Sequence, residues 1–183
     1  MQSMMRTYTY RDGLQSERLR TRFLGPGDVI PWSEFFRDEE ALEFFPMIEG
    51  NTPEEKSQWW IDRQMARYRE NRFGLQALHH RETNELIGQC GLLLQVVDGV
   101  EEVEVGYDIL RPYRCQGYAA EAAKLFIDKA FQNLADSVIS LIDPRNIPSQ
   151  RVAGKNGLSK EKLTIWSDCL LFVYRITREQ WSR

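Results

Sequence analysis

The chain has 183 residues, of which 42% are hydrophobic, and its net charge is -3, from 24 Lys and Arg against 27 Asp and Glu. This composition is typical of a globular domain and excludes a disordered chain, because the apolar residues can offset the entropy of ordering. No stretch reaches the roughly 18 to 20 apolar residues of a membrane span. A nucleic-acid binder shows a basic excess, which is absent here. We expect one domain over residues 1–183, with no nucleic-acid and no membrane partner.

The chain has three cysteines, Cys90, Cys115 and Cys169, which lie far apart without CxxC or Cys/His ligand spacing. An odd number of distant cysteines predicts reduced thiols in an intracellular protein, and we expect no metal. Residues 1–6 lack the apolar segment of a signal peptide. The expected location is therefore the cytoplasm.

The first part of the chain predicts short strands over residues 7–10 and 17–24, the second because its polar and apolar residues alternate. A helix is expected over residues 31–44, where aromatic residues recur at helical spacing. A second helix has a clear start signal, with Thr52 as N-cap, Pro53 at the first position and Glu55 completing a capping box. It should continue to about Asn71.

An antiparallel meander follows, with strands over residues 73–80, 85–97 and 100–110. Asp98-Gly99 between the last two is a strong hairpin signal. We expect His79 and His80 to close the first of these strands at a surface edge.

The last part predicts a helix over residues 117–134, a buried strand over 138–142 and a helix that begins with Asn146 as its expected N-cap and ends before Gly157. Two strands, 158–166 and 168–177, complete the chain. This order predicts a mixed sheet covered by helices on both faces, without the regular alternation of a doubly wound fold.

The segment between Ile109 and Ala119 carries the most chemical information, because a strand ends, a short loop passes and a helix begins at Gly117. Unpaired amides of the loop and of the first helical turn form an anion site together with the helix dipole. Gly117 and the small Ala119 would let a phosphate approach the backbone. The alternative is that Gly117 is an ordinary turn residue, since neither a P-loop nor a GxGxxG motif is present.

Arg114-x-x-Gly117-x-Ala119 resembles the [QR]-x-x-G-x-[GA] motif of the GNAT superfamily of acyl-CoA-dependent N-acetyltransferases. Further motifs resemble the RimJ/RimL-type branch of that family, in the correct order along residues 14–181. They are the opening segment 14–22, Asn146-x-x-Ser149, the Lys155-x-Gly157-Leu158 turn and the closing segment 174–181.

The resemblance implies an α/β fold, in which a mixed, mostly antiparallel sheet is splayed in the middle with helices on both faces. Acetyl-CoA would bind in the gap between the fourth and fifth strands. The enzyme would be an acyltransferase that moves an acetyl group from acetyl-CoA to a primary amine, protein N-terminal or small-molecule, by direct transfer in a ternary complex. We expect a monomer or a homodimer. The implied cofactor-binding residues are Tyr107, Asp108, Ile109, Arg114, Cys115, Gln116, Gly117, Tyr118, Ala119, Asn146 and Ser149.

Acetyl transfer requires a base for the amine, a donor for the thioester oxygen and an acid for the leaving thiolate. By resemblance, Glu104 is the expected base, although it also fits a solvated strand residue in the acidic run that begins at Glu101. A strand amide near Tyr107 or Asp108 would polarise the thioester. Ser149 is the expected acid, because Ala153 stands where many family members have Tyr, but its hydroxyl also fits a helix cap.

Three alternatives stay open at this stage. Cys115 could act as a nucleophile rather than only packing in the loop. The domain could bind CoA as a sensor or a structural part without catalysis, or bind a nucleotide at the Gly117 loop.

Acidic residues crowd segment 38–55, which by resemblance borders the acceptor site, and they favour a cationic or N-terminal amine.

Overall fold

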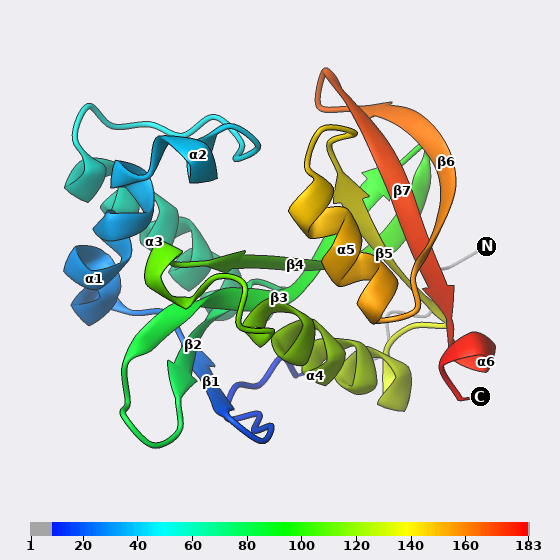
Figure 1. Ribbon diagram of the computed structural model, residues 1–183, viewed down its shortest axis with the longest axis horizontal. Helices are drawn as coiled ribbons and strands as arrows, with labels where there is room; N and C mark the ends of the chain where they lie inside the picture. The colour runs from blue at the N-terminus through cyan, green and yellow to red at the C-terminus, as the bar shows by residue number, and fades with distance from the viewer. Residues whose placement is uncertain (1–8, 183) are drawn as a thin grey trace.

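The computed structural model describes residues 9–182, which form one seven-stranded sheet with the order β1-β2-β3-β4-β5-β7-β6. Neighbouring strands are antiparallel except for β4 and β5, which are parallel (Figure 1). The predicted mixed, mostly antiparallel sheet is therefore confirmed. The strands are β1 (Leu19–Phe23), β2 (Leu75–His80), β3 (Leu86–Val97), β4 (Val100–Ile109), β5 (Ser137–Ile142), β6 (Ser159–Trp166) and β7 (Cys169–Thr177).

Helices lie on both faces of the sheet, as predicted, with α3 and α4 on opposite faces (Figure 1). None of those within residues 9–182 is long and apolar enough to cross a membrane. The α-helices are α1 (Val29–Ser33), α2 (Glu39–Leu42), α3 (Pro53–Arg69), α4 (Tyr118–Asn133), α5 (Ile147–Lys155) and α6 (Arg178–Trp181), and the 3₁₀ turns are η1 (Pro26–Asp28), η2 (Glu34–Arg37) and η3 (Arg111–Tyr113).

The expected continuous helix over residues 31–44 is wrong, because this stretch consists of α1, η2 and α2 in succession. Asp38 interrupts it with an extended backbone, φ -96° and ψ 97°. Its buried carboxylate pairs with Arg114, 2.8 Å away. A long-range ion pair thus overrides the helical pattern of the aromatic residues, which cluster around Trp32 in the core instead.

The start of α3 is confirmed in detail. Thr52 accepts a hydrogen bond from the amide of Glu55, the Glu55 carboxylate accepts one from the amide of Thr52, and Pro53 holds the first helical position. Asp98 and Gly99 also form the predicted hairpin turn, both with positive φ.

Two details at the edge of the sheet differ from expectation. Of the predicted strand 7–10, residues 7 and 8 lie outside the described residues, and residues 9 and 10 are not in a strand. His79 does not lie at a surface edge, because β2 is an inner strand between β1 and β3 and His79 is only 7% exposed. Its Nδ1 lies 3.0 Å from the carbonyl of Asn84. The short α6 was not expected.

The sheet opens between β4 and β5. The two strands are paired at one position alone, Glu104 opposite Ile139, whereas β3 and β4 are paired along their whole length. Beyond Glu104, the Ser140 hydroxyl donates to the carbonyl of Val105, and no further strand pairing follows. The splay predicted by resemblance is therefore confirmed.

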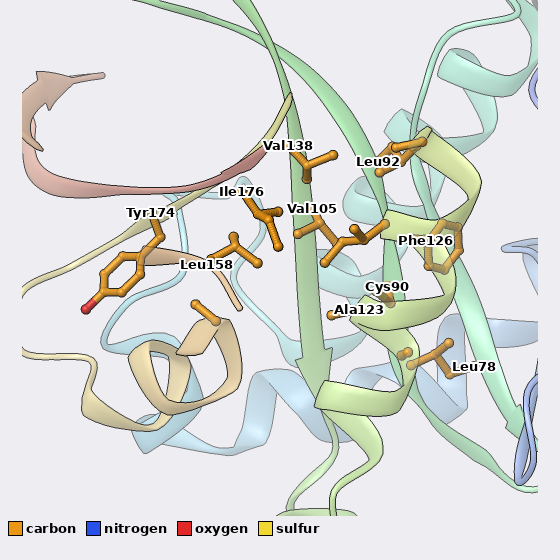
Figure 2. Close-up of a cluster of buried hydrophobic side chains, with 14 of the residues drawn as sticks. Leu78, Cys90, Leu92, Val105, Ala123, Phe126, Val138, Leu158, Tyr174 and Ile176 are labelled. Carbon is orange, nitrogen blue, oxygen red and sulfur yellow. The ribbon is translucent and has the colours of Figure 1, made fainter. Parts of the chain in front are cut away.

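The main core holds α4 against this opened sheet. Figure 2 shows Cys90, Leu92 and Val105 of β3 and β4 beside Ala123 and Phe126 of α4. All five are at most 1% exposed. The same cluster continues through Val138, Leu158, Tyr174 and Ile176 to α5 and the far strands. Close packing on both sides of the gap gives its walls a fixed position.

Candidate active site

A cavity of about 520 Å³ lies at the opening between β4 and α5, a volume within the usual range of ligand sites. Its walls come from the end of β4, the loop before α4, the first turns of α4 and α5, and segment 35–45. The two halves of the cavity differ in chemistry. One is lined by backbone and cations, and the other by aromatic rings and carboxylates.

In the first half, the start of α4 offers free backbone donors. Gly117 is the N-cap, with φ 87° and ψ -2°, and no side chain caps the helix. The amides of the first turn from Tyr118 onward have no partner within a helix. Gly117 and Ala119 both line the cavity. Such an uncapped helix start, with the positive end of its dipole, binds anions.

Two cations on α5 face the same half of the cavity. Arg151 and Lys155 line it, and neither has an ion pair or hydrogen bond with any described residue. They lie beside the uncapped start of α4, so this half combines free amides with unpaired positive charge. The sequence contained Lys155 in the Lys-x-Gly motif, whereas nothing in the pattern singled out Arg151.

The Arg114 side chain supports the loop from within. Its Nε donates to the carbonyl of Ile109 at 3.0 Å, and its guanidinium lies 2.8 Å from the carboxylate of Asp38. The neighbouring Cys115 has a positive φ of 60°, which is uncommon for a residue with a Cβ. Of the predicted loop residues, only Gln116 does not line the cavity; its side chain donates to the carbonyl of Pro112.

Tyr107 and Ser149 meet across the opening. The Tyr107 hydroxyl donates to the Ser149 carbonyl at 3.0 Å and lies 3.1 Å from the Ser149 hydroxyl. The N-cap of α5 is Asn146, as expected, because its Oδ1 accepts from the Ser149 amide at 3.1 Å. Ser149 is therefore not the capping residue, and its hydroxyl faces Tyr107. Burial raises the pKa of Tyr107, so the phenol keeps its proton at neutral pH.

Glu104 lies at the base of the splay and does not line the cavity. One carboxylate oxygen accepts from Gln95 Nε2 at 2.8 Å, and the other accepts from the Leu141 amide of β5 at 3.2 Å. The side chain is 9% exposed, and burial raises its pKa. Glu104 is thus not a solvated strand residue but joins β4 to β5.

Asp108, expected only to supply backbone to the cofactor, is a second carboxyl on β4; it is half-buried and does line the cavity. Gln89 Nε2 donates to its Oδ2 at 2.7 Å, and Gln89 Oε1 in turn accepts from the indole of Trp60 at 2.8 Å. Burial raises the pKa of Asp108 to about 6, and the charge of Arg114 opposes that rise. No sequence motif marked this chain of contacts, because it joins α3, β3 and β4.

The second half of the cavity is formed by segment 35–45 and by Tyr113. Phe45 packs against Trp60, with ring centroids 4.7 Å apart, and against Phe35 at 5.0 Å. Phe44 also lines the cavity, and the guanidinium of Arg145 lies 5.3 Å from its ring. The expectation that these aromatic residues border a site is consistent with their position.

The cysteines and the possible metal ligands complete the description of the site. All three cysteines are free, and Cys115 lines the cavity. Within residues 9–182, no group of three or more His, Cys, Asp or Glu side chains is placed to hold a metal ion.

Comparison with known proteins agrees with this arrangement. YkkB of Bacillus subtilis (strain 168), an uncharacterized protein, is 27% identical over 151 residues, which cover 81% of this chain and 86% of YkkB. The crystal structure of an acetyltransferase from Agrobacterium tumefaciens str. C58 has a TM-score of 0.76 and 26% identity, and the match covers 95% of this chain and 99% of that one. RimJ of Mycobacterium smegmatis, in complex with CoA-disulfide, has a TM-score of 0.74 at 20% identity, over 90% of this chain and 84% of RimJ, which shows a shared fold.

Residues 18–159 match the family described as acetyltransferase (GNAT) domain, and this span includes the splayed strands, the Gly117 loop and all of α5. The chain therefore belongs to the GNAT family of acetyltransferases.

Proposed function

We propose that this acetyltransferase transfers the acetyl group of acetyl-CoA to the nitrogen of a primary amine, within a ternary complex. The observation that carries the proposal is the uncapped start of α4 beside two unpaired cations, Arg151 and Lys155, on one wall of the cavity. Free backbone amides at a helix start and cations without partners are suited to the phosphates of CoA. The neighbouring acetyltransferase RimJ is described with CoA-disulfide bound, which is consistent with the same cofactor here.

The residues present fit the rest of that co-substrate. Backbone of Tyr107, Asp108 and Ile109 has no strand neighbour on the β5 side, so it is open to pair with the pantetheine arm. Asn146 lines the cavity at the start of α5 and would contact the same arm. The amides of the loop from Arg114 to Ala119 would hold the pyrophosphate.

The leaving thiolate needs a proton donor, and Ser149 is our proposed source. Its hydroxyl lies 3.1 Å from the protonated phenol of Tyr107, which would release its hydrogen bond to the Ser149 carbonyl and replace the proton that Ser149 donates. This pair supplies a tyrosine at the site although Ala153 occupies the family's usual tyrosine position. A β4 amide near Tyr107 or Asp108 would donate to the thioester oxygen.

The acceptor amine must lose a proton before it attacks, since a Lys-type ammonium has a pKa of about 10.4. The assignment of Glu104 as base stays a prediction. Its two oxygens already have protein donors, so it would have to act through water or after a rearrangement.

The finer assignment to the RimJ/RimL-type branch rests on the four sequence motifs and on neighbours such as RimJ, which share the fold. An acceptor at a protein N-terminus or on a small molecule fits that branch. A monomer or a homodimer remains the proposed state of assembly.

Titration calorimetry with acetyl-CoA tests the cofactor site. Lys155→Ala should weaken binding by about 3- to 30-fold, the value of a charge-assisted contact. Gly117→Glu should weaken it by about 10²-fold or more, because a carboxylate would face phosphate charge. Lys129→Ala is the matched control, since Lys129 lies on α4 outside the cavity lining and has no ion pair with a described residue. Equal affinity in all four folded proteins would refute the site.

Catalysis is tested separately from binding. Release of CoA thiol in the presence of a panel of primary amines would support catalysed acetyl transfer to an amine. Tight acetyl-CoA binding without release for any amine would instead support the alternative of a CoA-binding sensor or structural domain.

A further inference from the structure

The two faces of β4 present different groups to the cavity. Successive side chains of a strand point to opposite faces. Tyr107 points to Ser149 and α5, in the half proposed for the cofactor. Asp108 points to Gln89 and, through it, to Trp60 of α3, in the aromatic half. Asp108 therefore stands beside the segment proposed for the pantetheine arm, on the side from which an acceptor would come.

The Asp108 carboxylate retains capacity for a ligand. A carboxylate can accept about four hydrogen bonds. Gln89 Nε2 is the one hydrogen-bond donor to Asp108 among residues 9–182. Trp60 fixes the orientation of Gln89, because its indole donates to Gln89 Oε1 and turns the amide nitrogen toward Asp108. Glu104, by contrast, has a protein donor on each oxygen.

Most other carboxylates near the aromatic half are already paired. Asp38 pairs with Arg114, Glu43 with Arg145 and Glu54 with Arg37. Glu40 remains at the rim of the cavity, 72% exposed and 4.0 Å from Arg114. The paired carboxylates of the acidic segment thus attract a cationic acceptor less than the sequence implies. Asp108, inside the cavity, becomes the stronger candidate for binding the acceptor's ammonium group.

The wall around Asp108 is mostly apolar, with Arg114 and the exposed Glu40 as its charged members. Phe44, Phe45, Ala41 and Tyr113 line the cavity on this side. Phe45 is held in place by its contacts with Trp60 and Phe35. Besides Asp108, the exposed Glu40 is the one carboxylate among the described residues that line the cavity, so the further ammonium groups of a polyamine would find few partners of opposite charge. A single ammonium on an apolar group fits both the wall and the carboxylate.

We propose, on the basis of the proposed function above, that Asp108 binds the acceptor's ammonium group and takes its proton, and that the acceptor is a primary amine on an apolar or aromatic group. The proton moves from nitrogen to the Asp108 carboxylate. The freed nitrogen lone pair forms the C–N bond to the acetyl carbon, and the C–S electron pair leaves with sulfur. Ser149 protonates the thiolate, the second nitrogen proton passes through solvent to restore the Ser149 and Tyr107 hydroxyls, and Asp108 returns its proton to solvent.

The charged and titratable groups around Asp108 are compatible with this role. Burial raises its pKa to about 6, so the group is ionised at pH 7 and still basic enough to take a proton. Trp60 and Gln89 supply no charge. The groups nearest it on this side are Arg114 of the loop, Glu104 of its own strand and Glu40 across the cavity, whereas Cys90 of β3 is close but points to the opposite face, toward α4.

The first arm of the test is the pH profile of kcat. Asp108→Asn keeps an oxygen for Gln89 and removes only basicity. We expect kcat to fall by about 10²- to 10⁴-fold, acetyl-CoA affinity to stay within about 3-fold, and the rise of kcat through pH 6 to disappear. Glu101→Gln is the control, because Glu101 is an exposed carboxylate of β4 without a partner among the described residues. A profile unchanged in Asp108→Asn but lost in Glu104→Gln would overturn the proposal in favour of Glu104.

The second arm compares 2-phenylethylamine with ethylamine and spermidine. Burial of the phenyl ring should give 2-phenylethylamine a kcat/KM about 10- to 10²-fold above that of ethylamine. Phe44→Ala should reduce that advantage while leaving ethylamine nearly unchanged. A preference for spermidine, or no preference, would overturn the acceptor class.

Different results would contradict the proposed function and the role of Asp108. If wild-type protein acetylates none of these amines, nor any other primary amine, the proposed function itself is contradicted. If it acetylates amines but Asp108→Asn keeps the wild-type rate and pH profile, the proposed function stands and the role of Asp108 is refuted.

Discussion

The hydroxyls of Tyr107 and Ser149 lie 3.1 Å apart and join β4 to α5 across the opening of the sheet. Because they act as one proton donor in our account, Ser149→Ala and Tyr107→Phe should each lower kcat by about 10²-fold, the lower end of general acid catalysis, since a thiolate is already a good leaving group. Steady-state kinetics with calorimetry on the same proteins separates kcat from cofactor affinity. The double variant should lose little more than either single one.

A purely structural role for the pair predicts another result. Normal kcat, combined with a lower melting temperature in either variant, would show that the contact only holds α5 against β4.

The ion pair between Asp38 and Arg114 links segment 35–45 to the Gly117 loop. Asp38→Asn removes this ion pair and leaves the guanidinium with its hydrogen bond to the Ile109 carbonyl and with the exposed Glu40 carboxylate 4.0 Å away. We expect KM for acetyl-CoA to rise several-fold and stability to fall by about 1 to 3 kcal/mol, the cost of losing a charged hydrogen-bond partner. Denaturant titration and initial rates measure both.

Glu39→Gln provides the matched control, because Glu39 is the exposed neighbour of Asp38 and has no partner among the described residues. If both variants raise KM equally, the general charge of this segment is responsible rather than the ion pair.

Asp108 should make stability depend on pH in an unusual direction. Its pKa is raised from 3.8 to about 6 in the folded protein, so between these values the folded state holds a proton that the unfolded chain has released. The free energy of unfolding should therefore fall as pH rises from about 4 to 6, by about 1 to 3 kcal/mol. Asp108→Asn should remove this fall and be more stable than wild type at pH 7.

Chemical denaturation at pH 4 and at pH 7 gives the comparison. Should Asp108→Asn be less stable than wild type at pH 7, the carboxylate is stabilising in its ionised form and our account of its burial is wrong.

Cys115 occupies a left-handed backbone conformation in the Gly117 loop. Cys115→Gly should relieve that strain and raise stability by roughly 1 kcal/mol, although the flexible unfolded chain offsets part of the gain. Turnover should be retained if transfer is direct. Loss of turnover, or a wild-type acetyl-enzyme trapped by rapid quench, would instead identify Cys115 as a nucleophile.

Local signals in the sequence predicted local structure well. The capping box at Thr52, the Asp98-Gly99 turn and the Asn146 cap each lie within a few consecutive residues, and each forms as expected. The Gly117 loop belongs to the same class, because its chemistry follows from one strand, one turn and one helix start.

Contacts between distant segments could not be predicted in the same way. The ion pair of Asp38 with Arg114 broke an expected helix, and the hydrogen bonds from Trp60 through Gln89 to Asp108 created a site that no motif marked. Glu104 was proposed as the base from its position in the strand, but its hydrogen bond from the Leu141 amide depends on where β5 lies. Such features arise from topology rather than from neighbours in sequence.

The most direct test of the central claim is mass spectrometry of the reaction products. Purified protein is mixed with acetyl-CoA and 2-phenylethylamine, and the amine product and free CoA thiol are both quantified over time. We predict one N-acetylated amine for each CoA released, at a rate far above the reaction without protein and lost in Gly117→Glu. CoA release without an acetylated amine, or equal rates with wild type and Gly117→Glu, would contradict acetyl transfer to an amine at this cavity.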